Sequence, residues 1–152
     1  MTLTRLTPLR RKRAAPRKRG PNACARPRCR SHREKIMVGD ELLCSTHAME
    51  KADELFSLAV RADGECARCG ATSGLQCAHV ISRRYSGTRY VRTNAMALCV
   101  RCHKWQTEHP LEGEDFFREQ IGTLVYDELR RLALAFIGPV DYAAIIANGG
   151  VA

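Results

Sequence analysis

The chain lacks a long hydrophobic run, because no window approaches the roughly 20 apolar residues that a membrane-spanning helix needs. Its first residues also lack acidic side chains, and their basic residues lead into further charge instead of an apolar stretch. A secretory signal peptide is therefore not indicated. We expect a cytoplasmic protein without a membrane partner, in which cysteine thiols stay reduced.

The net charge of +9 comes almost entirely from the N-terminal tail. Residues 1–20 hold eight of the 25 basic side chains, and the rest of the chain holds 17 basic and 16 acidic residues. The tail has prolines and little apolar surface, so we expect residues 1–21 to be a disordered basic arm. It is either a solubility tail or, as we prefer, a DNA-tracking arm that neutralises phosphates. Its candidate DNA-binding residues are Arg10, Arg11, Lys12, Arg13, Arg17, Lys18 and Arg19.

Seven of the eight cysteines belong to closely spaced pairs, and Cys77 is the exception. In a reducing compartment such pairs indicate metal binding instead of disulfides. The strongest pattern combines Cys66-x2-Cys69 with Cys99-x2-Cys102. Paired CxxC motifs at this separation are typical of a structural zinc ion held by four thiolates.

A second cysteine group lies closer to the N-terminus, where Cys24-x4-Cys29 is followed by Cys44-x2-His47. This group predicts a tetrahedral zinc site with three cysteines and one histidine. The other interpretation is three buried cysteines beside an incidental histidine. Zinc is favoured because so short a stretch cannot form a core unaided. His32 is an alternative to His47 as the fourth ligand, although His47 has the better spacing.

Hydrophobic periodicity and turn residues predict the elements around these cysteines. Residues 36–43 favour a hairpin that turns at Gly39-Asp40, and residues 48–62 favour a helix joining the two zinc sites. Two strands are expected at 75–81 and 94–99, with a basic loop at 82–93 and a helix from Val100 to about Thr107.

The C-terminal part predicts helices that enlarge the core. Pro110 is expected to end the preceding pattern, and residues 114–121 favour the first of these helices. Residues 124–136 favour the second, with Thr123 as a candidate N-cap. Asp141 is expected to cap a last helix that extends through Asn148.

Three polar residues occur in order within and directly after the Cys66–Cys102 zinc pattern. They are His79 in the segment Ala78-His79-Val80-Ile81, then Asn94, then His103 directly after Cys102. With its cysteines, this series resembles an HNH endonuclease of the His-Me finger (ββα-metal) superfamily. It is most similar to small phage and prophage HNH proteins with a four-cysteine zinc frame. The resemblance covers Cys66 to about Pro110, under a third of the chain.

The fold implied by this resemblance is a small, zinc-stabilised α+β protein with a ββα-metal HNH core. An N-terminal Cys3His zinc knuckle and C-terminal helices accompany that core. The expected segments after the arm are the knuckle at 22–47, a linking helix at 48–63, the HNH core with its four-cysteine zinc at 64–110, and a helical segment at 111–152.

The candidate catalytic residues are His79, Asn94 and His103. Phosphodiester hydrolysis needs a base for the attacking water and positive charge near the reacting oxygens. His79 suits the role of base because an imidazole titrates near working pH, and the resemblance implies the same role. The resemblance also implies that Asn94 braces the loop or orients His79, and that His103 binds a catalytic Mg²⁺ or Mn²⁺ ion.

One position departs from the family pattern. HNH proteins often have Asp or His directly before the base, as a ligand of the catalytic metal, whereas this chain has Ala78. Cys77 is expected to face the other side of the strand. Three alternatives follow: His79 is itself a metal ligand; Asn94 or a carboxylate from the C-terminal part completes the site; or catalysis is weak.

We therefore expect a metal-dependent DNA endonuclease that nicks or cuts DNA, and the resemblance implies that it leaves 5′-phosphate and 3′-hydroxyl ends. Its two structural zinc ions would be separate from the catalytic ion. The alternatives are a non-catalytic zinc-containing nucleic-acid-binding adaptor and a nuclease specific for branched recombination intermediates. Candidate partners besides DNA are phage packaging or recombination proteins. The loop residues expected to contact DNA, unless the loop is merely solvated, are Arg83, Arg84, Tyr85, Arg89 and Arg92.

Overall fold

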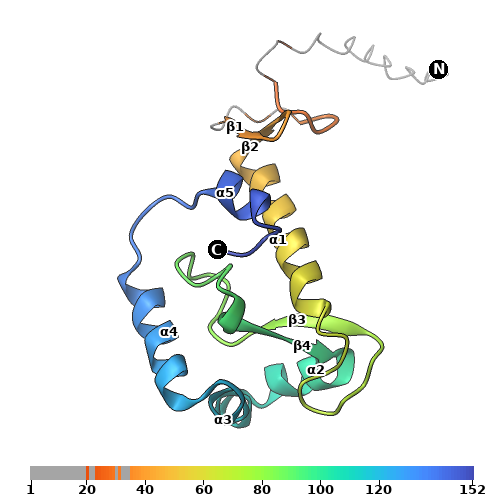
Figure 1. The fold of residues 1–152 in the computed structure, drawn as a ribbon, viewed down its shortest axis with the longest axis vertical. Helices are drawn as coiled ribbons and strands as arrows, with labels where there is room; N and C mark the ends of the chain where they lie inside the picture. Colours follow the sequence, from red (N-terminus) through yellow and green to blue (C-terminus); the bar gives the residue numbers. More distant parts are fainter. Residues whose placement is uncertain (1–19, 21–22, 30, 32–34) are drawn as a thin grey trace, which may run out of the picture.

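The computed structural model describes residues 20, 23–29, 31 and 35–152. This part of the chain forms a mixed α+β fold with two separate antiparallel hairpins and five α-helices (Figure 1). The predicted basic arm, apart from Gly20, and the alternative zinc ligand His32 lie outside the described residues. None of the helices in the described part has the length and apolar character needed to cross a membrane.

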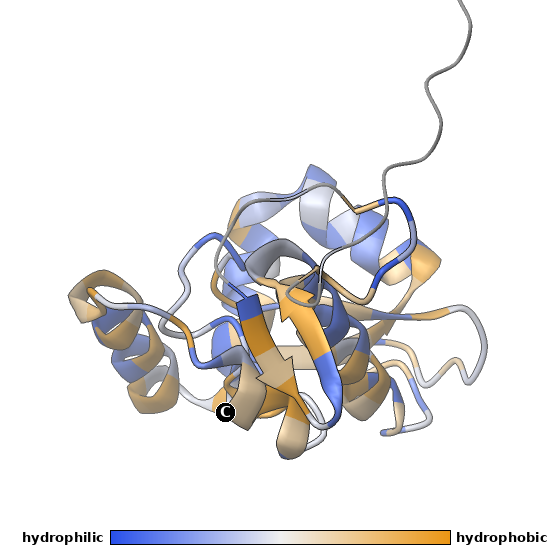
Figure 2. Cartoon of the chain, turned by 90° about the horizontal axis from the view of Figure 1, so that it is seen from above, coloured by the Kyte–Doolittle hydropathy of each residue, from blue (hydrophilic) through white to orange (hydrophobic). Residues whose placement is uncertain are grey.

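The first hairpin joins β1 (Lys35–Val38) to β2 (Glu41–Cys44), as predicted. Gly39 has a φ of 58°, which few other residues adopt easily, and this allows the tight turn. Both strands are mostly hydrophobic (Figure 2), and Leu43 is fully buried between them and their neighbours. The helix α1 (Ser45–Arg61) begins directly after Cys44, three residues earlier than its hydrophobic pattern indicated.

The second hairpin is the centre of the fold. It pairs β3 (Leu75–His79) with β4 (Ala95–Cys99), and His79 lies opposite Ala95. A 3-10 turn, η1 (Arg92–Asn94), precedes β4, so Asn94 ends that turn instead of opening the strand as predicted. The strand β3 likewise ends at His79, two residues before the predicted boundary.

Each face of this hairpin packs against a different helix. Successive residues of β4 from Ala95 to Leu98 alternate between two core clusters. Ala95 and Ala97 belong to a cluster with Phe56 of α1. Met96 and Leu98 belong to a second cluster with Cys102, which lies on α2 (Val100–Glu108). The period of two along a strand therefore divides the hairpin into an α1 face and an α2 face.

The C-terminal helices correct two predictions. Helix α3 (Pro110–Ile121) begins at Pro110, which was expected to stop the helical pattern; proline is tolerated at a first helical position because no intrahelical N–H bond is needed there. Helix α4 (Thr123–Ala135) has Gly122 as its N-cap, with a φ of 84°, so the prediction of Thr123 as the cap is wrong. Asp141 does cap α5 (Tyr142–Ala147), because its side chain accepts a bond from the Ala144 N–H at 3.0 Å.

The end of the chain returns to α1. Helix α5 packs on α1 and β1, and the C-terminus lies beside α1 in Figure 1. A Cβ atom at Gly150 would lie 2.3 Å from the backbone nitrogen of Phe56, so only glycine fits this close approach. The Ala152 N–H then donates to the Tyr90 carbonyl at 2.9 Å. The last residues thus connect the N-terminal half to the loop before η1.

Candidate active site

The cysteines of the paired CxxC motifs converge at one point, and we call this group the four-cysteine frame. It consists of Cys66, Cys69, Cys99 and Cys102, whose sulfur atoms all lie within 4.8 Å of one another. The Sγ atoms of Cys69 and Cys99 are 3.7 Å apart, close to the roughly 3.8 Å expected for two thiolates on tetrahedral zinc. Burial raises the pKa of Cys66, but backbone hydrogen bonds led by Cys99 outweigh it and lower the pKa to about 6. The group fits a structural zinc ion.

A second group of four potential zinc ligands lies closer to the N-terminus, and we call it the Cys3His frame. It consists of Cys24, Cys29, Cys44 and His47, which also lie within 4.8 Å of one another. The Nδ1 atom of His47 is 3.2 Å from the sulfur of Cys24 and 3.2 Å from that of Cys44. Because α1 starts at Ser45, His47 lies in its first turn and reaches back to the hairpin cysteines. This group also fits a zinc ion.

His79 ends β3 on the α1 face, where its ring is half-buried and 5.5 Å from the Phe56 ring. Its Nε2–H donates to the Arg89 carbonyl at 3.0 Å. The neutral ring therefore carries its lone pair on Nδ1, which lies 3.9 Å from the Cys77 sulfur. Burial lowers the pKa of His79, and although its bond to the Arg89 carbonyl opposes this, the charges of Arg83 and Arg89 reinforce it.

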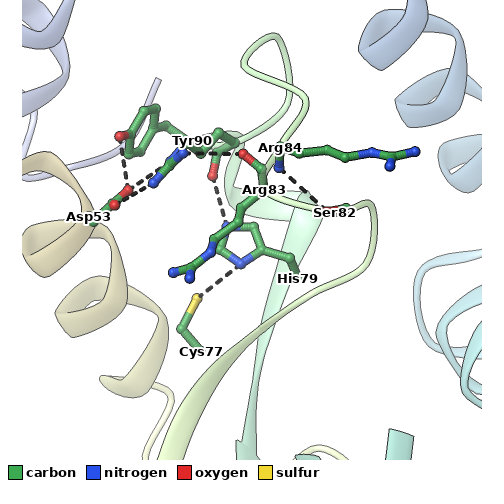
Figure 3. Close-up of polar contacts among 8 residues, drawn as sticks. Asp53, Cys77, His79, Ser82, Arg83, Arg84 and Tyr90 are labelled. Carbon is green, nitrogen blue, oxygen red and sulfur yellow. Dashed lines mark hydrogen bonds and ion pairs between the residues drawn. The ribbon is translucent and has the colours of Figure 1, made fainter. Parts of the chain in front are cut away.

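The surroundings of His79 are drawn in Figure 3. Asp53 of α1 accepts hydrogen bonds from Arg89, through Nε at 2.8 Å and through a second guanidinium nitrogen, and from the Tyr90 hydroxyl at 2.9 Å. Arg83 lies near enough to His79 for its charge to lower the pKa of the ring, and its side chain makes no hydrogen bond or ion pair within the described part of the chain (Figure 3). The Arg83 guanidinium can therefore bind an anionic ligand close to the neutral imidazole.

Asn94 is fully buried and all its polar atoms are used by the loop. Its Oδ1 accepts from the Ile81 N–H at 2.7 Å, and its Nδ2 donates to the carbonyls of Ile81 and Thr88 at 3.1 and 2.8 Å. These contacts hold both ends of the loop that follows β3. The amide is fully buried, so its oxygen is not accessible to a metal ion in this arrangement.

His103 lies on α2, where Nδ1 is 2.6 Å from the Gln76 amide oxygen. With Nδ1 as the donor, the lone pair of Nε2 points away from Gln76 and can bind a cation. Gln76 and His79 are three residues apart on β3, so their side chains lie on opposite faces. The structure therefore does not bring His79 and His103 together on one ion.

Ala78 is fully buried within the core cluster of the α2 face, with Cys102 and Phe117. Apart from the two zinc frames, the described residues contain no group of three or more His, Cys, Asp or Glu side chains at metal-binding distances. His103 would then be the nitrogen ligand of any divalent ion bound outside these two frames. Such an ion would take its other ligands from water and phosphate, as Mg²⁺ commonly does.

The loop residues predicted to contact DNA have different environments. Arg89 is held by Asp53, and Arg92 forms a more exposed ion pair with Asp63. Arg84 lies over the Tyr85 ring and donates to its hydroxyl at 2.6 Å, on the protein surface. A groove of about 270 Å³ opens between this loop and helices α3 and α4, lined by Val80, Ile81, Ser82, Tyr85, Glu114, Tyr126, Arg130, Ala133 and Leu134.

Two residues of the site were missed from the sequence. Asp53 was one of several charged residues on a linking helix, and no local motif connects it with Arg89, 36 positions away. Gln76 was part of a strand pattern, and only the strand register shows that it faces His103. Both contacts depend on how distant elements pack.

The comparisons with curated proteins and with solved structures found no match. A family model described as HNH endonuclease matches residues 66–109, from the first residue of the four-cysteine frame to the residue after α2. The matched segment includes His79, Asn94 and His103, with the hairpin and helix described above. Residues 66–109 are therefore similar to the HNH endonuclease family.

Proposed function

We propose that this chain is a metal-dependent HNH endonuclease that hydrolyses phosphodiester bonds in DNA. The observation that carries the proposal is the state of His79. Its Nε2–H is committed to the Arg89 carbonyl, so Nδ1 is left to take a proton. The charge of Arg83 acts on the same ring, and the Arg83 side chain has no hydrogen bond or ion pair among the described residues. A neutral imidazole next to a free cation suits a reaction in which water attacks a phosphate.

In this proposal His79 is the general base. Nδ1 removes a proton from the attacking water, while the Arg89 carbonyl stabilises the imidazolium that forms through the Nε2–H bond. Arg83 binds a phosphate oxygen and offsets the negative charge that grows there. Attack on phosphorus with departure of the 3′ oxygen gives 5′-phosphate and 3′-hydroxyl ends.

A divalent ion bound at His103 would supply further positive charge to the phosphoryl and leaving oxygens. The residues present support a single imidazole ligand, Nε2 of His103, whose orientation is held by Gln76. Mn²⁺ is a first-row transition ion and accepts a nitrogen ligand more readily than Mg²⁺, which takes oxygen ligands in strict octahedral geometry. We therefore expect stronger activity with Mn²⁺ than with Mg²⁺.

Fewer loop residues are available to contact DNA in this proposal than the sequence predicted. Arg83, Arg84 and Tyr85 are the loop residues available to DNA, and the groove beside them adds Arg130. Arg89 is instead a structural residue, because its guanidinium is bound to Asp53. The basic arm would add contacts that do not depend on DNA sequence.

A non-catalytic nucleic-acid adaptor is the second candidate, and buried Ala78 favours it. A plasmid-nicking assay with and without Mn²⁺ separates the two candidates. The nuclease predicts conversion of supercoiled plasmid to nicked or linear forms only when Mn²⁺ is present. DNA binding without cleavage at any divalent-ion concentration would support the adaptor.

A further inference from the structure

The peptide unit that bonds to His79 is fixed from both sides. The Arg89 carbonyl belongs to the peptide bond between Arg89 and Tyr90, and it accepts the His79 Nε2–H at 3.0 Å. The side chains on either side of that bond end on the same carboxylate: the Arg89 guanidinium and the Tyr90 hydroxyl both donate to Asp53. A rotation of this peptide plane would break contacts at both flanking residues.

The anchoring carboxylate is partly shielded from solvent and belongs to a helix that packs on the core. The Asp53 and Arg89 side chains are 32% and 17% exposed, so the pair is screened less than a surface ion pair. Asp53 belongs to α1, and its neighbours Ala52 and Phe56 are buried against the hairpin. The position of Asp53 is therefore set by the packing of α1 on the core and not by the loop.

Asp53 lies outside the segment that matches the HNH family, residues 66–109. Its contact with Arg89 spans 36 positions. Arg89 also donates to the Arg83 carbonyl at 3.3 Å, so the same network restrains the backbone that carries the free cation. One carboxylate on α1 thus controls two features of the site, the acceptor for His79 and the position of Arg83.

We propose that Asp53 is a positioning residue for the general base: by holding Arg89 and Tyr90, it fixes the carbonyl that selects the Nε2–H tautomer of His79. The inference rests on the proposed function for its catalytic consequence, but the tautomer itself exists independently of any cleavage. Asp53 does not touch the substrate in this proposal and acts only through the Arg89 peptide.

The test uses the full-length Asp53→Asn variant, which keeps the side-chain size and removes the charge. Asp63→Asn is the matched control, because Asp63 also pairs with an arginine of this segment, Arg92, without contacting the peptide that bonds to His79. Imidazole ¹⁵N shifts in labelled protein report the tautomer and titration of His79, which is assigned by comparison with His79→Ala. Cleavage rates are measured across pH on the same samples.

We expect one Nε2–H tautomer in the unmodified protein and in Asp63→Asn, and a mixture in Asp53→Asn. The maximal cleavage rate of Asp53→Asn should fall roughly 10- to 100-fold, by analogy with the loss seen when the hydrogen-bond partner that orients a metal-binding histidine is removed. The groups that face His79 are Asp53 from α1, Cys77 from β3, and Arg83 and Arg89 from the loop. Loss of the Asp53 charge and of the carbonyl bond both lower the His79 pKa, so the acidic limb should move to lower pH.

An unchanged tautomer in Asp53→Asn would overturn the proposal, even if its activity fell. A fall in rate with no movement of the acidic limb would do the same, because it would indicate general damage. If Asp53→Asn does not fold, Tyr90→Phe removes only one of the two flanking contacts and should give a smaller change in the same direction. If the unmodified protein cuts no DNA, the proposed function fails, whereas the ¹⁵N measurement still decides the role of Asp53.

Discussion

At the scale of single residues, His79 and His103 have similar chemistry and different surroundings. The bond between His79 and the Arg89 carbonyl commits Nε2, whereas the contact between His103 and Gln76 commits Nδ1. The two rings thus present opposite nitrogens, on opposite faces of one hairpin. This difference supports separate roles, with His79 as a base and His103 as a ligand.

The pH dependence of cleavage should report the protonation of His79. Burial lowers its pKa, an effect reinforced by Arg83 and Arg89 and opposed by the Arg89 carbonyl bond and by Asp53. The reactive neutral form therefore persists to lower pH than in a free imidazole, and cleavage should be lost only as pH falls below about 6.5. Single-turnover rates across the acidic-to-neutral range at saturating Mn²⁺ measure this limb, and a midpoint above that of a free imidazole would contradict the assignment.

The positions of His79, Asn94 and His103 could be predicted from the sequence because an ordered motif carries them. The groups to which these side chains hydrogen-bond could not be predicted from the sequence. The Asn94 bonds go to backbone groups of Ile81 and Thr88, and the His79 bond goes to a backbone carbonyl. A backbone hydrogen-bond partner cannot be recognised from the amino-acid sequence, because every residue supplies the same carbonyl and nearly all supply the same N–H group.

At the scale of elements, the four-cysteine frame and the Cys3His frame could each bind a zinc ion that stabilises a short hairpin. Each two-stranded hairpin is marginal alone, and each is joined to a frame of four metal-binding side chains. Cys99 also ends β4 directly before α2, so one frame fixes the angle between strand and helix. We infer that zinc organises the hairpin on which His79 and His103 depend.

Replacing Cys66 by serine should therefore destabilise the fold rather than act on chemistry alone. Cys77→Ser is the matched control, because it makes the same substitution in the same domain outside both frames. We expect Cys66→Ser to lose one of two zinc ions and about 4 kcal/mol or more of unfolding free energy. Zinc content by mass spectrometry and denaturant unfolding check this; a folded Cys66→Ser variant with two zinc ions would refute it.

Hydrophobic periodicity predicts most of the helices and strands, and the predicted and observed elements differ mainly in where they begin and end. Helix α1 starts at Ser45 because the zinc-frame residue Cys44 is its N-cap, which a hydrophobic pattern starting at Ala48 does not reveal. Helix α3 starts at Pro110, where a residue that ends one helix can equally begin another. The missed N-cap at Gly122 has a backbone explanation, since its φ of 84° is typical of glycine.

At the scale of the whole molecule, charge is divided between two regions. The described core pairs many of its cations, as Asp53 and Asp63 do for Arg89 and Arg92. The sequence places eight basic residues and no acidic residue in positions 1–20. Most of the sequence-independent attraction to DNA should therefore reside in the arm, and the choice of phosphate in the core.

Removal of residues 1–20 should weaken DNA binding across all sequences and reduce its salt dependence. If all eight basic residues contact phosphates, the slope of log K against log salt should fall by as much as about 7. Binding titrations of the full and truncated chains on one DNA duplex, between about 50 and 200 mM salt, give the two slopes. Equal slopes would mean that the arm does not contact DNA.

The central claim is that His79 is the base of a DNA endonuclease, and plasmid cleavage by His79→Ala tests it most directly. The control is His109→Ala, which removes an exposed histidine of the same domain whose Nδ1 only contacts the Trp105 carbonyl. With Mn²⁺ present, we predict cleavage by the unmodified protein and His109→Ala, and a fall of about 100-fold or more in His79→Ala with DNA binding and zinc content retained. Cleavage by His79→Ala at the rate of the unmodified protein would contradict the account.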